Sequence, residues 1–152
     1  VPNKIPFNEL MFAAYDCGAE FFVRVNDDSE FTSIGWLSKA IAALGSHHPP
    51  NVGVVGPNCR EGNTAILTHD MVHRTHFQIF HHYYPDVFSA SWIDDWISKV
   101  YGSKRTTRIS DWMIVHHTNV HGTRYVVQGQ EQGFLEEQLE KGRKTIAAWL
   151  KH

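Results

Sequence analysis

At residues 21–30 the sequence reads Phe21-Phe22-Val23-Arg24-Val25-Asn26-Asp27-Asp28-Ser29-Glu30. Aromatic and β-branched residues dominate its first half, which predicts a short buried strand over residues 20–25. The strand has to end at the polar cluster that follows, because a strand interior would not hold so many adjacent polar side chains. In open α/β sheets, ligands bind beyond the carboxyl ends of strands, so this cluster is a candidate site.

The segments on either side of this strand alternate between helical and extended patterns. We expect a helix over residues 9–19 begun by Asn8, and a second over residues 34–44 begun by Ser33. The apolar run at residues 51–56 predicts another strand that ends at Gly56-Pro57. This alternation predicts an α/β fold, with a mixed, mostly parallel sheet covered by helices.

The second half of the chain is less regular. Its patterns predict, in order, a helix over residues 69–80, an aromatic loop over 81–91, a helix over 93–101, strands over 111–118 and 123–128, and an amphipathic helix over 131–150. The chain has 152 residues, of which 42% are hydrophobic, so we expect one domain over residues 1–152. The formal net charge of -2 gives no basic bias, which argues against nucleic acid as the main partner.

The cluster at the end of the first strand has the chemistry of a cation site. Adjacent carboxylates such as Asp27 and Asp28 repel each other unless a positive charge lies near them. Mg²⁺ or Mn²⁺ takes oxygen ligands from one or two carboxylates and completes its shell with phosphates. The alternative is a simple turn, in which Asp28 or Ser29 caps the structure that follows.

A second acidic group is Trp92-Ile93-Asp94-Asp95-Trp96. Two carboxylates between two tryptophans are poorly solvated if the rings pack inward, so one of them can have a raised pKa and serve as a general base. The alternative is the start of a helix, where the dipole favours acidic residues.

Histidines and an arginine near the end of the chain form a third group, in His116-His117 and in His121-Gly122-Thr123-Arg124. Imidazole is a common metal ligand, and Arg124 is suited to meet a phosphate. The alternative is that each histidine is a hydrogen-bonded structural residue.

Taken in order, these motifs resemble those of nucleotide-sugar-dependent glycosyltransferases of the GT-A type. That family has a strand ending in a DxD-type metal motif, a glycine-containing loop, an acidic pair near a helix start and a late histidine. The chain offers Asp28 for the first, residues 56–63 for the second, Asp94-Asp95 for the third and His116 to His121 for the fourth, although Asn26 stands where the family's motif begins with Asp.

The resemblance implies roles for single residues. Asp28 is implied as the metal ligand, with Asp27 and Asn26 near the ribose or sugar of the donor. The late histidine that completes the metal site is implied to be His121, or else His117 or His116. In inverting members the second residue of the acidic pair, here Asp95, is the catalytic base, and Asp94 supports it.

The resemblance also implies the rest of the reaction. We expect Mn²⁺ or Mg²⁺ as cofactor, a nucleotide-sugar donor, and a glycan or glycoprotein acceptor, with either a retaining or an inverting outcome. The family's N-terminal nucleotide-binding half has no counterpart here, so we expect this chain to work with that missing part or with another subunit.

Two other functions fit parts of the sequence. A zinc-dependent hydrolase would use His69 and His73, four apart on the expected helix, together with His117. A carbohydrate-binding module would stack sugars on Tyr83-Tyr84-Pro85, Phe88 and Trp92.

Overall fold

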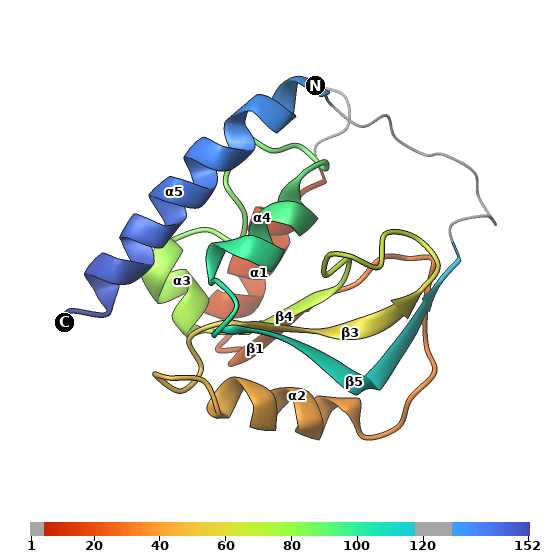
Figure 1. Ribbon diagram of the computed structural model, residues 1–152. Coiled ribbons are helices and arrows are strands. Elements are labelled where there is room, and N and C mark those ends of the chain that lie inside the picture. Colours follow the sequence, from red (N-terminus) through yellow and green to blue (C-terminus); the bar gives the residue numbers. More distant parts are fainter. Residues whose placement is uncertain (1–4, 118–128) are drawn as a thin grey trace.

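A computed structural model describes residues 5–117 and 129–152 (Figure 1). The elements along the chain are α1 (Phe7–Asp16), β1 (Phe21–Arg24), β2 (Ser29–Phe31), α2 (Trp36–Gly45), β3 (Val54–Arg60), β4 (Asp70–His73), α3 (Thr75–Phe80), α4 (Ile93–Val100), β5 (Thr106–His116), η1 (Gly129–Glu131) and α5 (Gln132–Trp149). The α/β class expected from the sequence is confirmed.

The five strands form one mixed sheet in the order β1-β4-β3-β5-β2. Only the β3–β5 pairing is parallel, and the other three are antiparallel. The expectation of a mostly parallel sheet is therefore not met. The reason lies at β4, which runs between β1 and β3 and is antiparallel to both.

The segment that forms β4 was predicted to be helical over residues 69–80. Only its second part is helical, as α3. In the first part Met71 and Val72 are fully buried on opposite faces of the sheet, packed in two different clusters. Pairing with two strands and burial on both faces outweigh the local helical pattern, as is common for interior strands.

Strand β3 also departs from the prediction, because it continues past Gly56-Pro57 to Arg60. Its register with β5 shifts between Pro57 and Asn58, where Pro57 faces Ile109 and Asn58 faces Met113. Proline has no N–H to donate to a ladder, and such an irregularity is where a sheet tolerates it.

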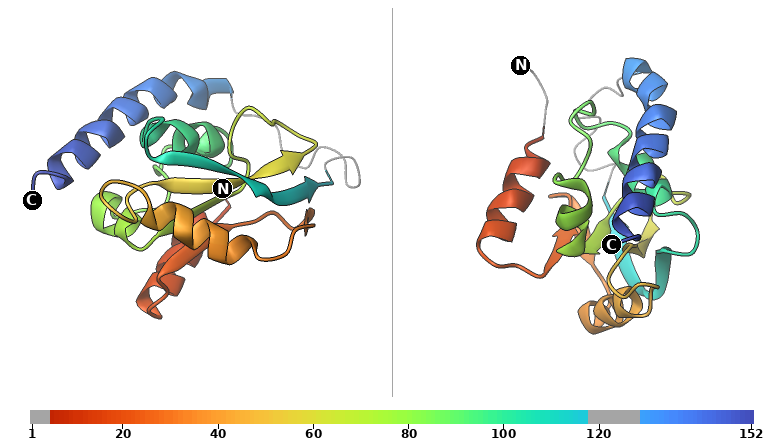
Figure 2. Two further views of the ribbon diagram at one scale, coloured as in Figure 1. Left: turned by 60° about the horizontal axis from the view of Figure 1, so that its bottom comes forward. Right: turned by 90° about the vertical axis from the view of Figure 1, so that its left-hand side faces the viewer.

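Two apolar clusters lie on opposite faces of the sheet. The larger one packs the sheet against α1, α3, α4 and α5, and the smaller one packs it against α2 alone, as Figures 1 and 2 show. Successive strand residues alternate between them, as Val54 and Val55 do. Within the described ranges, no helix combines the length and the apolar character that crossing a bilayer requires.

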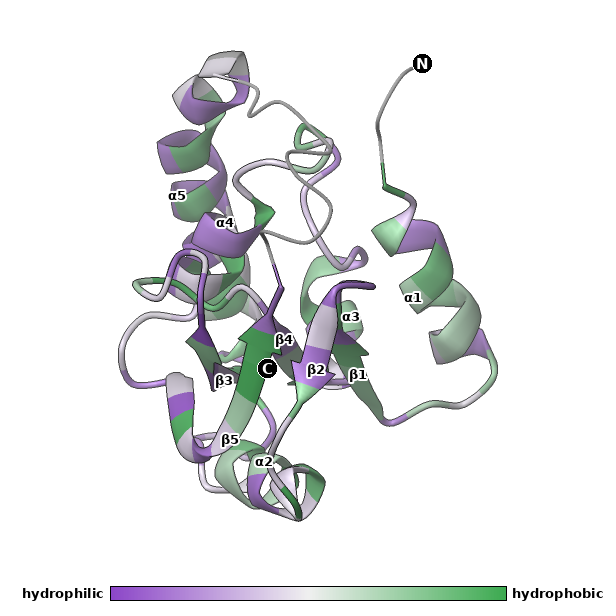
Figure 3. Cartoon of the chain, turned by 90° about the vertical axis from the view of Figure 1, so that its right-hand side faces the viewer, coloured by the Kyte–Doolittle hydropathy of each residue, from purple (hydrophilic) through white to green (hydrophobic). Residues whose placement is uncertain are grey.

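The sheet curls so that its two edges approach each other. Strands β1 and β2 are at opposite edges, yet residues 25–28 alone connect them. The Ser29 hydroxyl at the start of β2 lies 2.5 Å from Nε2 of His69, which precedes β4. Figure 3 shows hydrophilic colour around the turn that joins β1 and β2. The curl brings that turn, the start of β4 and the end of β5 together.

Candidate functional site

Asp28 and His116 meet where the β1–β2 turn approaches the end of β5. Ser29 pairs with His116 in the β2–β5 ladder, which places the neighbouring Asp28 beside the imidazole. Asp28 Oδ1 lies 3.0 Å from His116 Nε2, and both side chains are about nine-tenths buried. The backbone N–H of His117 donates to the Asp28 carbonyl at 2.8 Å, which fixes the turn against β5.

Asn26 adds a polar group whose orientation follows from its other neighbour. Its Oδ1 lies 3.4 Å from Nη1 of Arg24, which donates to it, so its Nδ2 faces His116 Nε2 at 3.2 Å. His116 Nε2 therefore accepts from Asn26 and is unprotonated, and in this tautomer its lone pair also faces the carboxylate oxygen of Asp28. In that tautomer the proton lies on His116 Nδ1, which is buried and has no hydrogen-bond partner among the described residues.

His69 closes the other side of this group. It is fully buried, its ring meets that of His116 edge to face at a centroid distance of 5.3 Å, and it bonds Ser29. Burial, and after it the positive charge of Arg24, lower the pKa of His69 to about 4. His69 is therefore a neutral imidazole at neutral pH.

Arg24 joins this group to the acidic pair of α4. Its side chain is 3% exposed, and its Nε donates to Asp70 at 3.0 Å. Its Nη2 donates to Asp94 Oδ1 at 2.5 Å and to the Thr68 carbonyl at 2.6 Å. One guanidinium thus bridges β1, β4 and α4, and its bond to Asn26 continues to the turn. We call Arg24, Asp70 and Asp94, with Asn26, Asp28 and His116, the polar network.

Asp70 is the fully buried carboxylate at the centre of this network. The hydroxyls of Tyr83 and Tyr84 donate to it at 2.8 and 2.5 Å, in addition to the bond from Arg24. A buried charge is tolerated when it is paired and hydrogen-bonded in this way. Tyr83 and Tyr84 are buried with Phe88 in the larger apolar cluster, so the expectation that these three rings stack on sugars is wrong, whereas Trp92 is only partly buried against that cluster.

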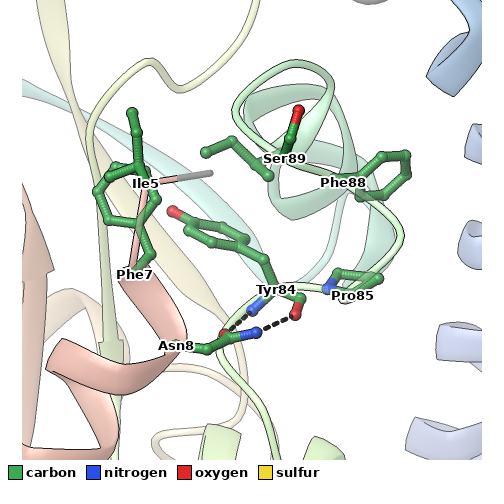
Figure 4. Close-up of a pocket in the computed structure, with 8 residues that line it drawn as sticks. Ile5, Phe7, Asn8, Tyr84, Pro85, Phe88 and Ser89 are labelled. Atoms are coloured by element: carbon green, nitrogen blue, oxygen red, sulfur yellow. Dashed lines mark hydrogen bonds between the residues drawn. The ribbon is translucent and has the colours of Figure 1, made fainter. Parts of the chain in front are cut away.

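The loop that carries both tyrosines is fixed by the start of α1. The Asn8 side chain accepts from the backbone N–H groups of Tyr83 and Tyr84 and donates to the Tyr84 carbonyl. Figure 4 shows the two bonds to Tyr84. Asn8 was predicted to cap α1. Instead its side chain makes these three hydrogen bonds and acts as a clamp on the loop, and α1 has no side-chain cap. The tyrosine hydroxyls are thereby held over Asp70.

The two carboxylates of α4 have different partners. Both lie in its first turn, as predicted. Asp94 is 30% exposed, and burial raises its pKa to about 6 against the opposing effect of Arg24. Asp95 accepts from Lys99 Nζ at 2.9 Å, one helical turn away, and is 22% exposed. Asp94 is thus part of the polar network, and Asp95 lies next to it on the helix.

The other residues predicted for the site are scattered. Asp27 is exposed in the same turn as Asp28. His117 is 41% exposed and meets Glu30 Oε2 at 2.9 Å. His121 and Arg124 lie outside the described residues. Within residues 5–117 and 129–152, no group of three or more His, Cys, Asp or Glu side chains is arranged to hold a metal ion.

The zinc ligands considered from the sequence are not brought together. His69 precedes β4, whereas His73 ends it and pairs in register with Phe21 at the far end of β1. Along a strand, four residues span about 13 Å, so both histidines cannot bind one ion. His73 Nδ1 instead accepts from the backbone N–H of Thr75 at the start of α3.

Arg24 and Asp70 hold the polar network together but were not among the predicted site residues. A signal for Arg24 was present, because a charged residue inside the apolar run of β1 requires a buried partner. Its partners were not visible, since Asp70 lay in a predicted helix and Asp94 is 70 residues away.

No protein-family model, no curated protein and no solved structure matches the chain.

Proposed function

We propose that this chain is the catalytic portion of a GT-A-type glycosyltransferase, which moves a sugar from a nucleotide-diphosphate donor to a hydroxyl of a glycan or another acceptor. The observation that supports the proposal is the polar network itself. Three motifs separated by up to 90 residues, at Asn26-Asp27-Asp28, at Asp94-Asp95 and at His116, are linked by a continuous series of contacts. If Asn26-Asp27-Asp28 were only a capping turn, there would be no reason for it to contact the other two motifs.

The pair formed by Asp28 and His116 fits a divalent cation. Mg²⁺ is bound octahedrally at about 2.1 Å, so neighbouring ligand atoms lie about 3.0 Å apart. Asp28 Oδ1 and His116 Nε2 have this separation. A cation also suits two facing acceptor atoms, since it removes their repulsion, and when it binds it replaces the Asn26 amide as the partner of the His116 Nε2 lone pair. We therefore assign Mn²⁺ or Mg²⁺ to Asp28 and His116, in preference to His117, whose ring faces Glu30 on the surface.

A bound cation would neutralise the diphosphate of the donor. Asp27 and Asn26 lie in the same turn, and we place them near the ribose or sugar. Arg124 remains a candidate for the phosphates, and His121 a candidate further ligand.

The acidic pair supplies the base in this proposal. Asp95 accepts the proton of the acceptor hydroxyl, whose oxygen bonds to the sugar while the bond from the sugar to the diphosphate breaks. Asp94 cannot move freely, because Arg24 holds it, so it acts as the supporting residue that orients the first turn of α4. Lys99, on the surface, is a partner that Asp95 can exchange for the substrate hydroxyl.

Asparagine substitutions of the two carboxylates test this assignment. In a transferase-active form, Asp95→Asn keeps the shape and removes the base, and we expect turnover to fall by about two to four orders of magnitude. Donor binding should change little. Release of nucleoside diphosphate from a panel of nucleotide sugars measures turnover.

Asp94→Asn is the matched comparison. It should lower turnover less than Asp95→Asn does, and it should alter the pH profile. Normal turnover in both variants would contradict the role of the acidic pair, and a dead Asp94→Asn beside an active Asp95→Asn would move the base to Asp94.

A further inference from the structure

A groove lies between the end of α4 and the end of α5, away from the polar network. Figure 1 shows the C-terminal end of α5 on the opposite side of the molecule from the end of β5 that carries His116. The floor of the groove is apolar and includes Val100, Ile146 and Leu150. Its volume is about 260 Å³, which is enough for one large apolar side chain but small for a drug-sized ligand.

Two arginines also line this groove. Arg105 is held by a bond from its Nε to the His48 carbonyl at 2.8 Å, and Arg143 lies near the Lys99 carbonyl. A guanidinium presents several N–H donors in one plane and is suited to pairing with carboxylates in two-bond geometry. The groove thus offers an apolar floor beside two guanidinium groups that can donate to anions.

The surroundings of the groove are strongly basic. Residues 99–105 and 141–152 contain seven of the 14 Lys and Arg residues and none of the 16 Asp and Glu residues of the chain. Two of the seven are paired with acids from elsewhere, as Lys99 is with Asp95 and Lys144 is with Glu140. The chain as a whole is slightly acidic, so this basic end is a local feature that favours an acidic partner.

The shape of this end distinguishes a protein partner from a membrane. Proteins that enter the bilayer interface insert protruding apolar side chains. Among the described residues, none of the strongly exposed large apolar side chains lies in residues 99–105 or 141–152. A hollow receives an apolar group from outside, as a groove does when a partner inserts an anchoring side chain.

We propose that this groove binds an acidic segment of a partner protein, which inserts one apolar side chain between α4 and α5 and places carboxylates against Arg105 and Arg143. This interaction surface is independent of the proposed transferase activity.

The probe for this surface is a fluorescein-labelled peptide of alternating aspartate and glutamate with one central leucine. Its binding to the whole chain is measured by fluorescence anisotropy at low ionic strength. Arg143→Glu removes a cation of the groove, and Ala147→Trp fills the groove without changing its charge. We expect each to weaken binding by about tenfold or more.

The matched controls are the adjacent exposed positions Lys144→Glu and Ala148→Trp, which do not line the groove. They should weaken binding by less than about twofold. Replacing the leucine of the peptide by glycine should weaken its binding to the wild type. The same replacement should not further weaken its binding to Ala147→Trp, in which the groove is already filled.

Three results would overturn the proposal. Absence of saturable binding of the leucine peptide is the first. The second is an equal loss in Lys144→Glu and Arg143→Glu, which would assign binding to diffuse charge. In the third, the peptide does not bind, but phosphatidylserine vesicles bind the wild type and Ala147→Trp equally, which would assign the basic end to a membrane.

Discussion

At the scale of single residues, Arg24 decides whether the polar network exists. It lies inside an apolar strand and neutralises Asp70, which is fully buried, and Asp94, which is partly buried. The net contribution of a buried ion pair to stability is small, but removal of one partner leaves the other charge buried without compensation. Loss of Arg24 therefore leaves two carboxylates without their cation.

This interdependence gives a prediction for stability. Arg24→Met leaves Asp70 without its cation, and we expect the free energy of unfolding to fall by about 3–5 kcal/mol. Urea denaturation at neutral pH measures the change. The double variant Arg24→Met/Asp70→Asn should recover part of the loss.

The surface pair of Lys39 and Asp111 is the control, because both side chains are largely exposed. Lys39→Met should cost no more than about 1 kcal/mol. An Arg24→Met loss as small as that of Lys39→Met would mean that the buried charges are not coupled.

At the scale of elements, the sequence patterns predicted helices α4 and α5 better than they predicted the sheet. Helices α4 and α5 lie within one residue of their predicted bounds at each end, because their apolar periodicity, and for α4 its acidic start, are local signals. Strand β4 was missed because pairing with β1 and β3 outweighs its local helical pattern, and the nearest residues of β1 lie more than 40 positions away in the sequence.

In the candidate site, too, local sequence signals predicted some residues, and the pairing of distant segments determined the others. Asp28, Asp94 and Asp95 were identified from local motifs, since carboxylates after a strand or at a helix start are visible in the sequence. That His116 rather than His117 faces Asp28 depends on the β2–β5 register, which no local pattern specifies.

The contact between Asn8 of α1 and the loop that carries Tyr83 and Tyr84 can also be tested. Asn8→Ala removes the acceptor of the Tyr83 and Tyr84 backbone N–H groups. We expect hydrogen exchange of these two amides to become faster by about tenfold, which corresponds to about 1.4 kcal/mol of local opening energy. Glu9→Ala, on the exposed side of the same helix, should leave both rates unchanged. Unchanged exchange in Asn8→Ala would show that the clamp does not hold the loop.

At the scale of the whole molecule, one side of the sheet remains open to further association. Within the described residues β1 pairs only with β4, so its other edge presents unpaired N–H and C=O groups. Large apolar side chains are also exposed before and along α2, where Ile34 is 97% and Leu37 46% exposed. Exposed apolar surface of this kind is typical of interfaces. We propose that a protein partner covers this exposed apolar surface.

If so, the isolated chain should associate with itself and bind an exposed-hydrophobe dye. Static light scattering over a range of concentrations measures the association, and Ile34→Lys/Leu37→Lys should reduce it. Ser38→Lys, which adds a cation elsewhere on α2, is the control. A monomer without dye binding would contradict the proposed interface.

The metal site that we propose at Asp28 and His116 would hold a divalent cation together with a nucleoside diphosphate. The most direct test is to measure thermal unfolding with Mn²⁺ alone, with uridine or guanosine diphosphate alone, and with Mn²⁺ and the diphosphate together. We expect the midpoint to rise with both together, because a ligand present at 100 times its Kd stabilises the folded state by about 2.7 kcal/mol. Asp28→Ala and His116→Ala should abolish the Mn²⁺-dependent rise, whereas His117→Ala should retain it. A full Mn²⁺-dependent rise in Asp28→Ala would contradict the account.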